Sequence, residues 1–135
     1  MTNIRGLRNK NPLNIRRTST SWQGLRKTQT DPAFFQFTSL EYGYRAAFRT
    51  LHTYYTRYHL RTIAQMIARW APPVENDTKK YIQVVARRAG ISADAEVDIY
   101  NKQTMTAIVS AMSFMENGIE ADPAAVAAGW SLAMA

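Results

Sequence analysis

From residue 39 onward, apolar residues recur at spacings of three and four, which is the spacing of one face of an α-helix. A chain that repeats this pattern almost to its end must bury these faces against one another, so it folds mainly from helices. The first such run predicts a helix from Ser39 to about Tyr58, with one apolar stripe formed by Leu40, Tyr44, Ala47, Phe48, Leu51 and Tyr55.

Start and stop signals divide the rest of this region into four further helices. Thr62-Ile63-Ala64-Gln65 reads as a capping box, and Ala71-Pro72-Pro73 ends the helix that it begins. Glycines follow the next two segments at the position expected for a C-terminal cap. The predicted helices run from Thr62 to Trp70, from Asn76 or Asp77 to Gly90, from Asn101 to Gly118, and onward from Asp122-Pro123.

Residues 8–38 have a different pattern, in which turn-forming residues separate short alternating pieces. Leu13-Asn14-Ile15 and Phe35-Gln36-Phe37 are two of these pieces, and we expect them to pair in a hairpin or a three-stranded sheet. The predicted fold class is therefore α+β and mostly α-helical. The chain forms a single domain over residues 1–135, with a small β-lobe at 1–38 and a helical lobe at 39–135.

Basic residues are concentrated at the start of the chain. Residues 1–30 contain seven Lys and Arg and no acidic residue, whereas residues 31–135 contain ten basic and ten acidic residues. The net charge of +7 therefore comes from the first thirty residues. Such a patch favours a polyanionic partner, such as nucleic acid, an anionic membrane surface or the bacterial cell wall. A basic surface that serves only solubility is the alternative.

The composition also bounds the chemistry. With no cysteine, disulfides, thiol nucleophiles and cysteine-ligated metals are excluded. His52 and His59 lie seven residues apart without a nearby carboxylate, so we expect no metal site and no cofactor. No apolar run approaches the roughly 20 residues of a membrane-spanning helix, and the N-terminus lacks the apolar region of a signal peptide.

Two glutamates are candidates for catalysis. Glu116 ends an apolar helix, where the helix macrodipole and apolar neighbours both raise a carboxyl pKa, as a general acid requires. Glu75 lies between a proline stop and a helix start, close in sequence to Trp70. Either glutamate has a structural alternative, as an exposed acid or as a partner of the helix dipole. Helix capping or a turn accounts for Glu41, Asp94, Glu96, Asp98, Glu120 and Asp122.

Long motifs in a fixed order connect the chain to known proteins. They are residues 8–16 (RNKNPLNIR), 22–24 (WQG), 34–37 (FFQF), 43–46 (GYRA) and 69–78 (RWAPPVENDT), followed by Tyr81. This order resembles a family of small bacteriophage and prophage proteins, described as virion structural proteins or lytic transglycosylases. The likeness covers most of the chain, from about residue 5 to residue 118.

A more distant likeness concerns cell-wall enzymes. The Asn-rich hairpin with its Trp-x-Gly and Phe-x-Phe pieces resembles the β-lobe of N-acetylglucosaminidases with a lysozyme-like fold. Residues 73–82 are similar to a late helix motif of lytic transglycosylases, in which the residues matching Glu75 and Tyr81 line the glycan cleft and the glutamate is not the proton donor. In those enzymes the catalytic Glu ends a helix before the hairpin, and here no acid precedes it. We therefore hypothesise a permuted lysozyme-like domain in which Glu116 supplies the acid.

The resemblance and the side-chain chemistry together give a set of candidate substrate-binding residues. Asparagine amides suit sugar hydroxyls, although they also fix hairpins internally. Aromatic rings stack on sugars, although at helical spacing they more often belong to the core, as we expect for Tyr44. Arg16 and Arg17 are able to meet carboxylates of the cell wall. The substrate-binding candidates are Asn11, Asn14, Trp22, Tyr44, Trp70, Asn76, Thr78 and Tyr81.

The resemblance implies a peptidoglycan-degrading muramidase, and in particular a lytic transglycosylase that cleaves the MurNAc–GlcNAc bond with one glutamate. Glu75 as the acid, a noncatalytic phage structural protein that binds cell wall, and a nucleic-acid-binding module are the alternatives. The expected partners are glycan strands and other virion proteins, with no membrane insertion and no nucleic acid. The expected location is the virion, or the bacterial cytoplasm before release.

Overall fold

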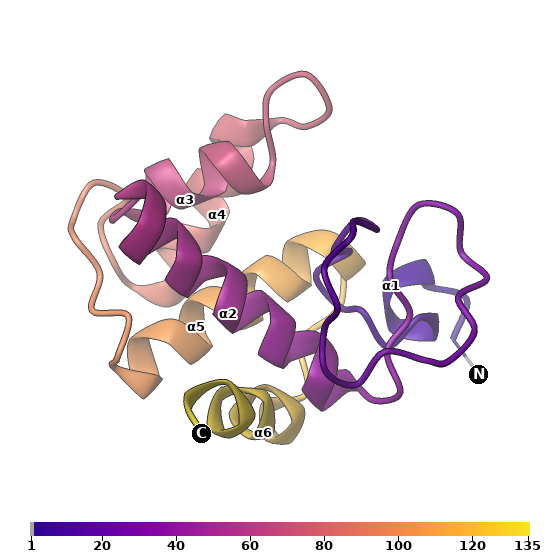
Figure 1. Ribbon diagram of the computed structural model, residues 1–135. Coiled ribbons are helices and arrows are strands. Elements are labelled where there is room, and N and C mark those ends of the chain that lie inside the picture. The colour runs from indigo at the N-terminus through magenta and orange to yellow at the C-terminus, as the bar shows by residue number, and fades with distance from the viewer. Residues whose placement is uncertain (1) are drawn as a thin grey trace.

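The computed structural model describes residues 2–135, and helices dominate its architecture (Figure 1). The five predicted helices are present, and a one-turn helix that the sequence did not predict precedes them. No helix within residues 2–135 combines the length and the apolar character needed to cross a bilayer. The helices are α1 (Arg5–Arg8), α2 (Leu40–Tyr58), α3 (Ile63–Trp70), α4 (Thr78–Ala89), α5 (Lys102–Asn117) and α6 (Pro123–Met134).

Most of the predicted helix ends are confirmed in detail. Thr62 and Gln65 make both hydrogen bonds of a capping box at the start of α3. Gly90 and Gly118 adopt left-handed conformations just after α4 and α5. Ser39 precedes α2 but its side chain makes no capping hydrogen bond. The side chains that cap the starts of α4, α5 and α6 are Asp77, Asn101 and Asp122.

Helix α2 runs through the middle of the molecule and its N-terminal part packs against α6, while α4 packs against α5 (Figure 1). The close approach of α2 and α6 requires Gly129, because a Cβ there would lie 2.6 Å from the Cβ of Tyr44. The Tyr44 ring is 1% exposed in the core, and its hydroxyl lies 2.9 Å from the Ser113 hydroxyl of α5. The main core therefore includes the region where α2, α5 and α6 meet, and it extends to buried residues of α3 and α4.

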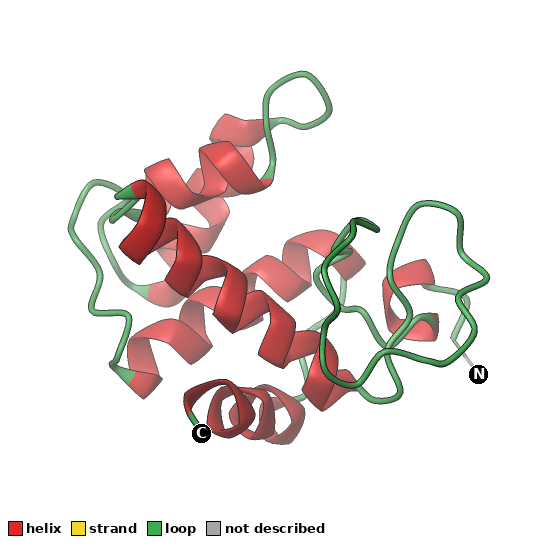
Figure 2. Ribbon diagram, viewed as in Figure 1, coloured by secondary structure: helices red, strands yellow, loops and turns green. Residues whose placement is uncertain are grey.

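The expected α+β class with a β-hairpin lobe is wrong, and with it the lysozyme-like outline drawn from that hairpin. Within residues 2–135 the extended segments form isolated bridges and no sheet, and Figure 2 shows helices and loops alone. In the first 38 residues these bridges join Arg16 to Phe34 and Leu25 to Phe37. We call residues 2–38 the N-terminal lobe. It is a folded loop region with one short helix.

In the N-terminal lobe, side-chain amides form hydrogen bonds with several backbone N–H and carbonyl groups that a neighbouring strand would bond in a sheet. Asn11 accepts from the Ile15 N–H and donates to the carbonyls of Ile15 and Phe35. Gln29 accepts from the Gln36 N–H and donates to the carbonyls of Arg26 and Gln36. Backbone groups bonded in this way are satisfied without a strand ladder. The two alternating pieces do meet, since the Phe35 N–H donates to the Ile15 carbonyl at 3.1 Å, but within residues 2–135 such backbone pairs do not extend into a sheet.

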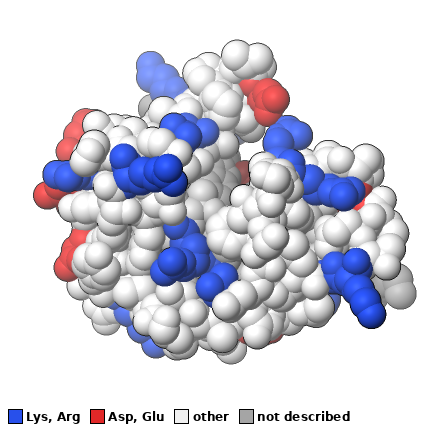
Figure 3. Space-filling view, in the orientation of Figure 1, with Lys and Arg blue, Asp and Glu red and all other residues white. Residues whose placement is uncertain are grey.

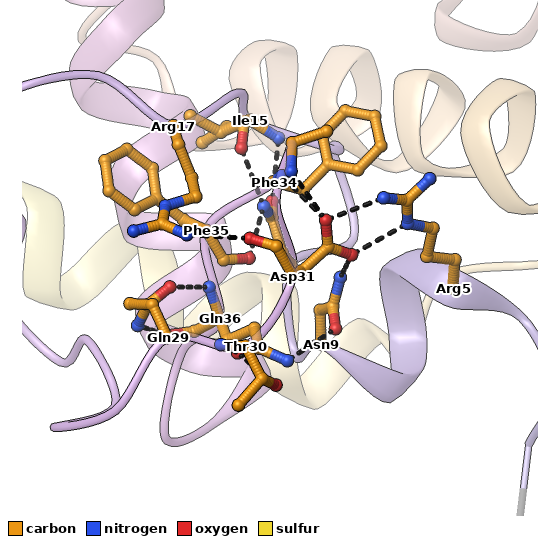
Figure 4. A network of polar contacts seen from close by, with 12 residues as sticks. Arg5, Asn9, Ile15, Arg17, Gln29, Thr30, Asp31, Phe34, Phe35 and Gln36 are labelled. Carbon is orange, nitrogen blue, oxygen red and sulfur yellow. Dashed lines mark hydrogen bonds and ion pairs between the residues drawn. The ribbon is translucent and has the colours of Figure 1, made fainter.

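Asp31 is the centre of the N-terminal lobe (Figure 4). Its carboxylate, 8% exposed, accepts hydrogen bonds from Arg5 at 2.6 and 2.7 Å, from the Asn9 amide at 2.9 Å, and from the N–H groups of Ala33 and Phe34. The Arg5 guanidinium is the largest cause that holds the pKa of Asp31 well below its usual range, and the other donors add to it. One carboxylate thus ties helix α1 to the turn at residues 31–34.

We expect Asp31→Ala to lower the free energy of unfolding by about 2–3 kcal/mol, because it leaves the buried Asn9 amide and two backbone N–H groups without their acceptor. Denaturant unfolding at pH 7 measures the loss. The control is Asp94→Ala, at an exposed carboxylate, which should change stability by less than about 0.5 kcal/mol. Equal losses in the two variants would contradict the central role of Asp31.

The wild-type protein should also lose stability in acid through Asp31. The native pKa of Asp31 is depressed, so the unfolded chain binds a proton that the native state does not. The contribution is complete above the ordinary range of an aspartate and falls as the pH drops toward the native pKa. Unfolding of wild type and Asp31→Ala between pH 7 and pH 2 should therefore converge at the acid end.

Candidate functional site

A pocket of about 430 Å³ lies where the N-terminal lobe meets the helices. Figure 3 shows a hollow in this face of the molecule, with basic and acidic side chains close to one another at its rim. Its walls come from four parts of the chain that are distant in sequence. The lining residues are Leu13 to Arg16, Thr18 and Phe34 of the lobe, Thr50 and Tyr54 of α2, Trp70, Ala71, Glu75 and Asn76 around the α3–α4 loop, and Glu116 of α5.

Glu116 is the half-buried acid of this pocket. It is the penultimate residue of α5, and its two carboxylate oxygens accept different donors. The Asn14 amide donates to Oε1 at 2.9 Å, and the Tyr81 hydroxyl of α4 donates to Oε2 at 2.9 Å. Burial raises the pKa of Glu116, while the hydrogen bonds from Asn14 and Tyr81 and the positive charge of Arg16 oppose part of this rise.

Burial likewise raises the pKa of the Tyr81 hydroxyl, and the neighbouring Glu116 charge raises it further. Tyr81 is therefore a neutral hydrogen-bond donor at physiological pH. The Tyr81 side chain is 4% exposed, so the hydroxyl is fixed by the packing of α4 against α5. Glu116 is thus oriented from one side by the helices and from the other side by the lobe.

Asn14 reaches Glu116 from a left-handed backbone conformation, with φ of 53°. Its amide oxygen is buried without a hydrogen-bond partner, and so is the amide oxygen of Asn117. Both oxygens point at Gly6 of α1, where a Cβ would lie 2.8 Å from the Asn14 oxygen and 2.7 Å from the Asn117 oxygen. The Asn117 amide nitrogen donates to the Pro12 carbonyl at 2.8 Å. The lobe and the end of α5 are therefore fitted together around a residue with no side chain.

Arg16 and Glu75 make an ion pair at the pocket, with 3.1 Å between Nη2 of Arg16 and Oε2 of Glu75. This pair connects the N-terminal lobe to the α3–α4 loop. The Arg16 guanidinium also lies 5.2 Å from the centre of the Phe34 ring. Because both side chains are more than half exposed, the ion pair contributes little to stability and is open to competition from solvent.

The structure brings several of the predicted site residues together and separates others. Asn14, Trp70, Asn76 and both glutamates line the pocket, and Tyr81 contacts one of them, Glu116. Trp70 packs edge-on against Tyr54, a further pocket residue whose position beside the apolar stripe of α2 gives no separate signal in the sequence.

Four predicted residues lie away from the pocket lining. Asn11 is fully buried and makes the hydrogen bonds that shape the lobe. Trp22 packs in a small cluster with Phe35, Phe37 and Ala46, and Tyr44 is in the main core. Thr78 donates a hydrogen bond from its hydroxyl to the Ala71 carbonyl. Within residues 2–135, no three His, Asp or Glu side chains gather in the manner of a metal site.

Comparison with known proteins shows that the chain is similar to a bacteriophage protein. Protein P5 of Pseudoalteromonas phage PM2 is 45% identical over 117 residues, which cover 84% of this chain and 71% of that protein. No family model matches the chain. The resemblance to bacteriophage proteins is thus confirmed at that level. The relative's name specifies no activity, so glycan cleavage stays a prediction.

We expect Gly6→Ala to displace Asn14 or Asn117 and to cost about 1–3 kcal/mol of stability. If Asn14 moves away, Glu116 loses a donor that lowers its pKa, so the pKa of Glu116 should rise further. Titration of the Glu116 carboxyl carbon by NMR measures this. The control, Gly90→Ala, strains a left-handed residue with no atom near its Cβ, so it should lose about 1 kcal/mol and leave the Glu116 pKa unchanged. An unchanged Glu116 pKa together with unchanged stability in Gly6→Ala would contradict the role of Gly6.

We expect Glu116→Gln to stabilise the protein near pH 8 by a few degrees in Tm. Because the native pKa of Glu116 is raised, the native state holds a proton that the unfolded chain has released, so stability falls as the pH rises through and above the ordinary range of a glutamate. Glutamine removes that loss. The difference in Tm between variant and wild type should shrink toward pH 4. A difference that is constant with pH would show that burial does not raise the pKa of Glu116.

Proposed function

The chain belongs to the family of Protein P5 of Pseudoalteromonas phage PM2, and we propose that it is a virion component that cleaves peptidoglycan as a lytic transglycosylase. The proposed bond is the glycosidic bond between a muramyl residue and the following glucosaminyl residue. The phage family supports the virion setting. The proposal of cleavage rests on the pocket and on the likeness of residues 73–82 to a motif of lytic transglycosylases.

The observation that carries the proposal is the environment of Glu116. A general acid needs a raised pKa, a fixed orientation and access to substrate. Burial supplies the first, the donors Asn14 and Tyr81 supply the second, and a pocket of about 430 Å³ supplies the third. This volume lies within the range of about 300–1,000 Å³ that is common for small-ligand sites.

In the proposed reaction Glu116 acts twice. Its protonated carboxyl first gives its proton to the glycosidic oxygen, and the bond from that oxygen to the muramyl anomeric carbon breaks. The hydroxyl on C6 of the same sugar then attacks the anomeric carbon and gives its proton to the Glu116 carboxylate. The products are a 1,6-anhydro end and a new free hydroxyl, and the acid is regenerated without water.

The two hydrogen bonds to Glu116 suit this cycle. Asn14 and Tyr81 donate to the carboxylate, so they stabilise the charged form that appears when the proton moves to the leaving oxygen. Trp70 and Tyr54 offer aromatic faces in the same pocket for stacking against a sugar ring. The chain's own groups thus bind the sugar, orient the acid and hold its charge between the two steps.

Glu75 is less suited to be the acid. It is 56% exposed and pairs with Arg16, so it lacks the burial that raises the pKa of Glu116. A hydrolase of the usual kind needs a second carboxylate as nucleophile or base. Glu75 is the other carboxylate among the lining residues, and Arg16 pairs with it in the empty pocket, whereas the scheme with one carboxylate needs no chemical role for it.

A noncatalytic protein that binds the cell wall is the second candidate. It is favoured by a structural role of the same hydrogen bonds, since Glu116 joins the lobe to α4 and α5 through Asn14 and Tyr81. A phage component that only holds glycan would keep such a link for its shape. This candidate predicts glycan binding without released products.

Digestion of purified peptidoglycan tests the proposal. Wild type should release soluble fragments with 1,6-anhydromuramyl ends, identified by mass spectrometry. Glu116→Gln should lower the rate by a factor of about 10²–10⁴, the usual contribution of a general acid. Glu75→Gln should keep the cleavage chemistry and the product type.

The other outcomes separate the alternatives. Loss of products in Glu75→Gln alone would assign the acid to Glu75, and products with free reducing ends would indicate a hydrolase. Folded wild type that binds peptidoglycan and releases nothing, across a range of pH and salt, would establish the noncatalytic candidate. Unfolding midpoints of all three proteins show whether a loss of activity is a loss of fold.

A further inference from the structure

We propose that Arg16 is the receptor for a carboxylate of the substrate, and that Glu75 occupies this receptor in the empty pocket. This inference rests on the proposed function, because it names the part of the glycan that the pocket recognises. It distinguishes a muramyl strand, which carries an acidic lactyl group or an acidic stem peptide, from a neutral glucosamine polymer such as chitin.

Few charged side chains line the pocket. The charged side chains among its lining residues are one cation, Arg16, and two acids, Glu75 and Glu116. Glu116 already accepts hydrogen bonds from Asn14 and Tyr81, so Arg16 and Glu75 are left as the ion pair of the empty pocket. A second carboxylate entering the pocket gains an attractive partner when it meets Arg16 in place of Glu75.

The ion pair between Arg16 and Glu75 is easily replaced by a pair between Arg16 and a ligand carboxylate. Its two side chains are 61% and 56% exposed, and pairs of this kind contribute about 1 kcal/mol or less. Glu75 lies on an exposed stretch from Pro72 to Asp77 that has no helix or strand of its own, so it is able to withdraw without disturbing the core. The pair is therefore a contact that a ligand of the same chemistry can replace at little cost.

Arg16 is positioned by the N-terminal lobe and has N–H donors available for a carboxylate. Its backbone bridges to Phe34, and its guanidinium lies 5.2 Å from the centre of the Phe34 ring. The Arg5 guanidinium lies 4.6 Å from the centre of the same ring. Of its five N–H donors, one is used by Glu75 among the hydrogen bonds of the described residues. A carboxylate is the group that a guanidinium binds through two parallel hydrogen bonds, a geometry that a neutral sugar hydroxyl lacks.

Arg16 lies close to the proposed catalytic acid, Glu116. Arg16 and Glu116 line the same pocket, and the Arg16 charge is close enough to lower the pKa of Glu116. A carboxylate on Arg16 therefore lies beside the acid. In a muramyl residue, the lactyl group on C3 belongs to the same ring whose C1 carries the bond to be broken. Recognition of this group would place the correct glycosidic oxygen near Glu116.

Calorimetric titration with three soluble tetrasaccharides tests the proposal. One is chitotetraose, which has no carboxylate. The second is a peptide-free strand of alternating glucosaminyl and muramyl residues, whose acid is the lactyl carboxylate. The third is the same strand with stem peptides, whose acids belong to the peptide. Every protein in the series also carries Glu116→Gln, so that no ligand is cleaved during the measurement.

Arg16→Gln should weaken binding of an acidic tetrasaccharide by about tenfold and leave chitotetraose unchanged. Glu75→Gln should strengthen binding of the same acidic ligand by up to about fivefold, because it removes the competing carboxylate. The matched control is Glu120→Gln, which breaks the exposed Arg88–Glu120 ion pair of 2.8 Å outside the pocket lining and should change no affinity. Arg16→Lys keeps the charge without the two-pronged geometry, so it should recover part of the loss.

The two acidic ligands identify the source of the carboxylate. An effect of Arg16→Gln on the peptide-free strand assigns the lactyl group, and an effect confined to the peptide-bearing strand assigns the stem peptide. Equal effects of Arg16→Gln on all three ligands, or none, would overturn the proposal, as would weaker acidic binding in Glu75→Gln. If the parent protein and wild type bind none of the three ligands, the proposed function itself fails. Selective failure of the variants leaves that function standing.

Discussion

The buried Asp31 carboxylate is the interaction on which the shape of the pocket depends. A loop region of almost forty residues has no sheet to hold it, and its own hydrophobic cluster is small. Five hydrogen bonds converge on one side chain and connect α1, Asn9 and the turn after Asp31. Because the Asn9 amide and the N–H groups of Ala33 and Phe34 would otherwise lack this acceptor, the carboxylate fixes where the rest of the lobe lies.

The lobe in turn places functional groups against the helical part of the molecule. Asn14 and Arg16 come from one loop of the lobe, Tyr81 and Glu116 from two helices, and Glu75 from the loop between α3 and α4. None of these elements forms the pocket alone. The acid, its donors and the adjacent cation are brought together by tertiary packing, in which Gly6 allows two asparagine side chains to lie against α1.

The helical part of the fold was readable from the sequence because its signals are local. Capping residues, proline stops and apolar stripes each act within one or two turns, and the structure agrees with them at Thr62, Asp77 and Asn101. Helix α1 was missed because four residues centred on a glycine carry no periodic pattern. The β-lobe was predicted wrongly because alternation is shared by strands and by extended loops whose polar groups bond to side chains.

The site was predictable in part, for the same reason. The end of an apolar helix marked Glu116, and the segment around residue 75 marked the loop that faces it. The hydrogen bond from Asn14 joins residues 102 positions apart, and the fit around Gly6 depends on three segments at once, so neither has a local signal. Tyr44 and Trp22 had aromatic rings suited to sugars, but burial rather than ring type decides which aromatic residues face a pocket.

The pocket residues are far apart along the chain, and this distance affects when the pocket can form during synthesis. A ribosome makes the N-terminal lobe first and the acid-bearing end of α5 last among the parts of the pocket. Contacts between such distant segments form only after the intervening chain is available, and they close a large loop. An unfinished chain therefore contains the lobe, its cation and most of the aromatic wall, but no assembled acid. Synthesis itself delays the assembly of the pocket until the end of α5 has been made.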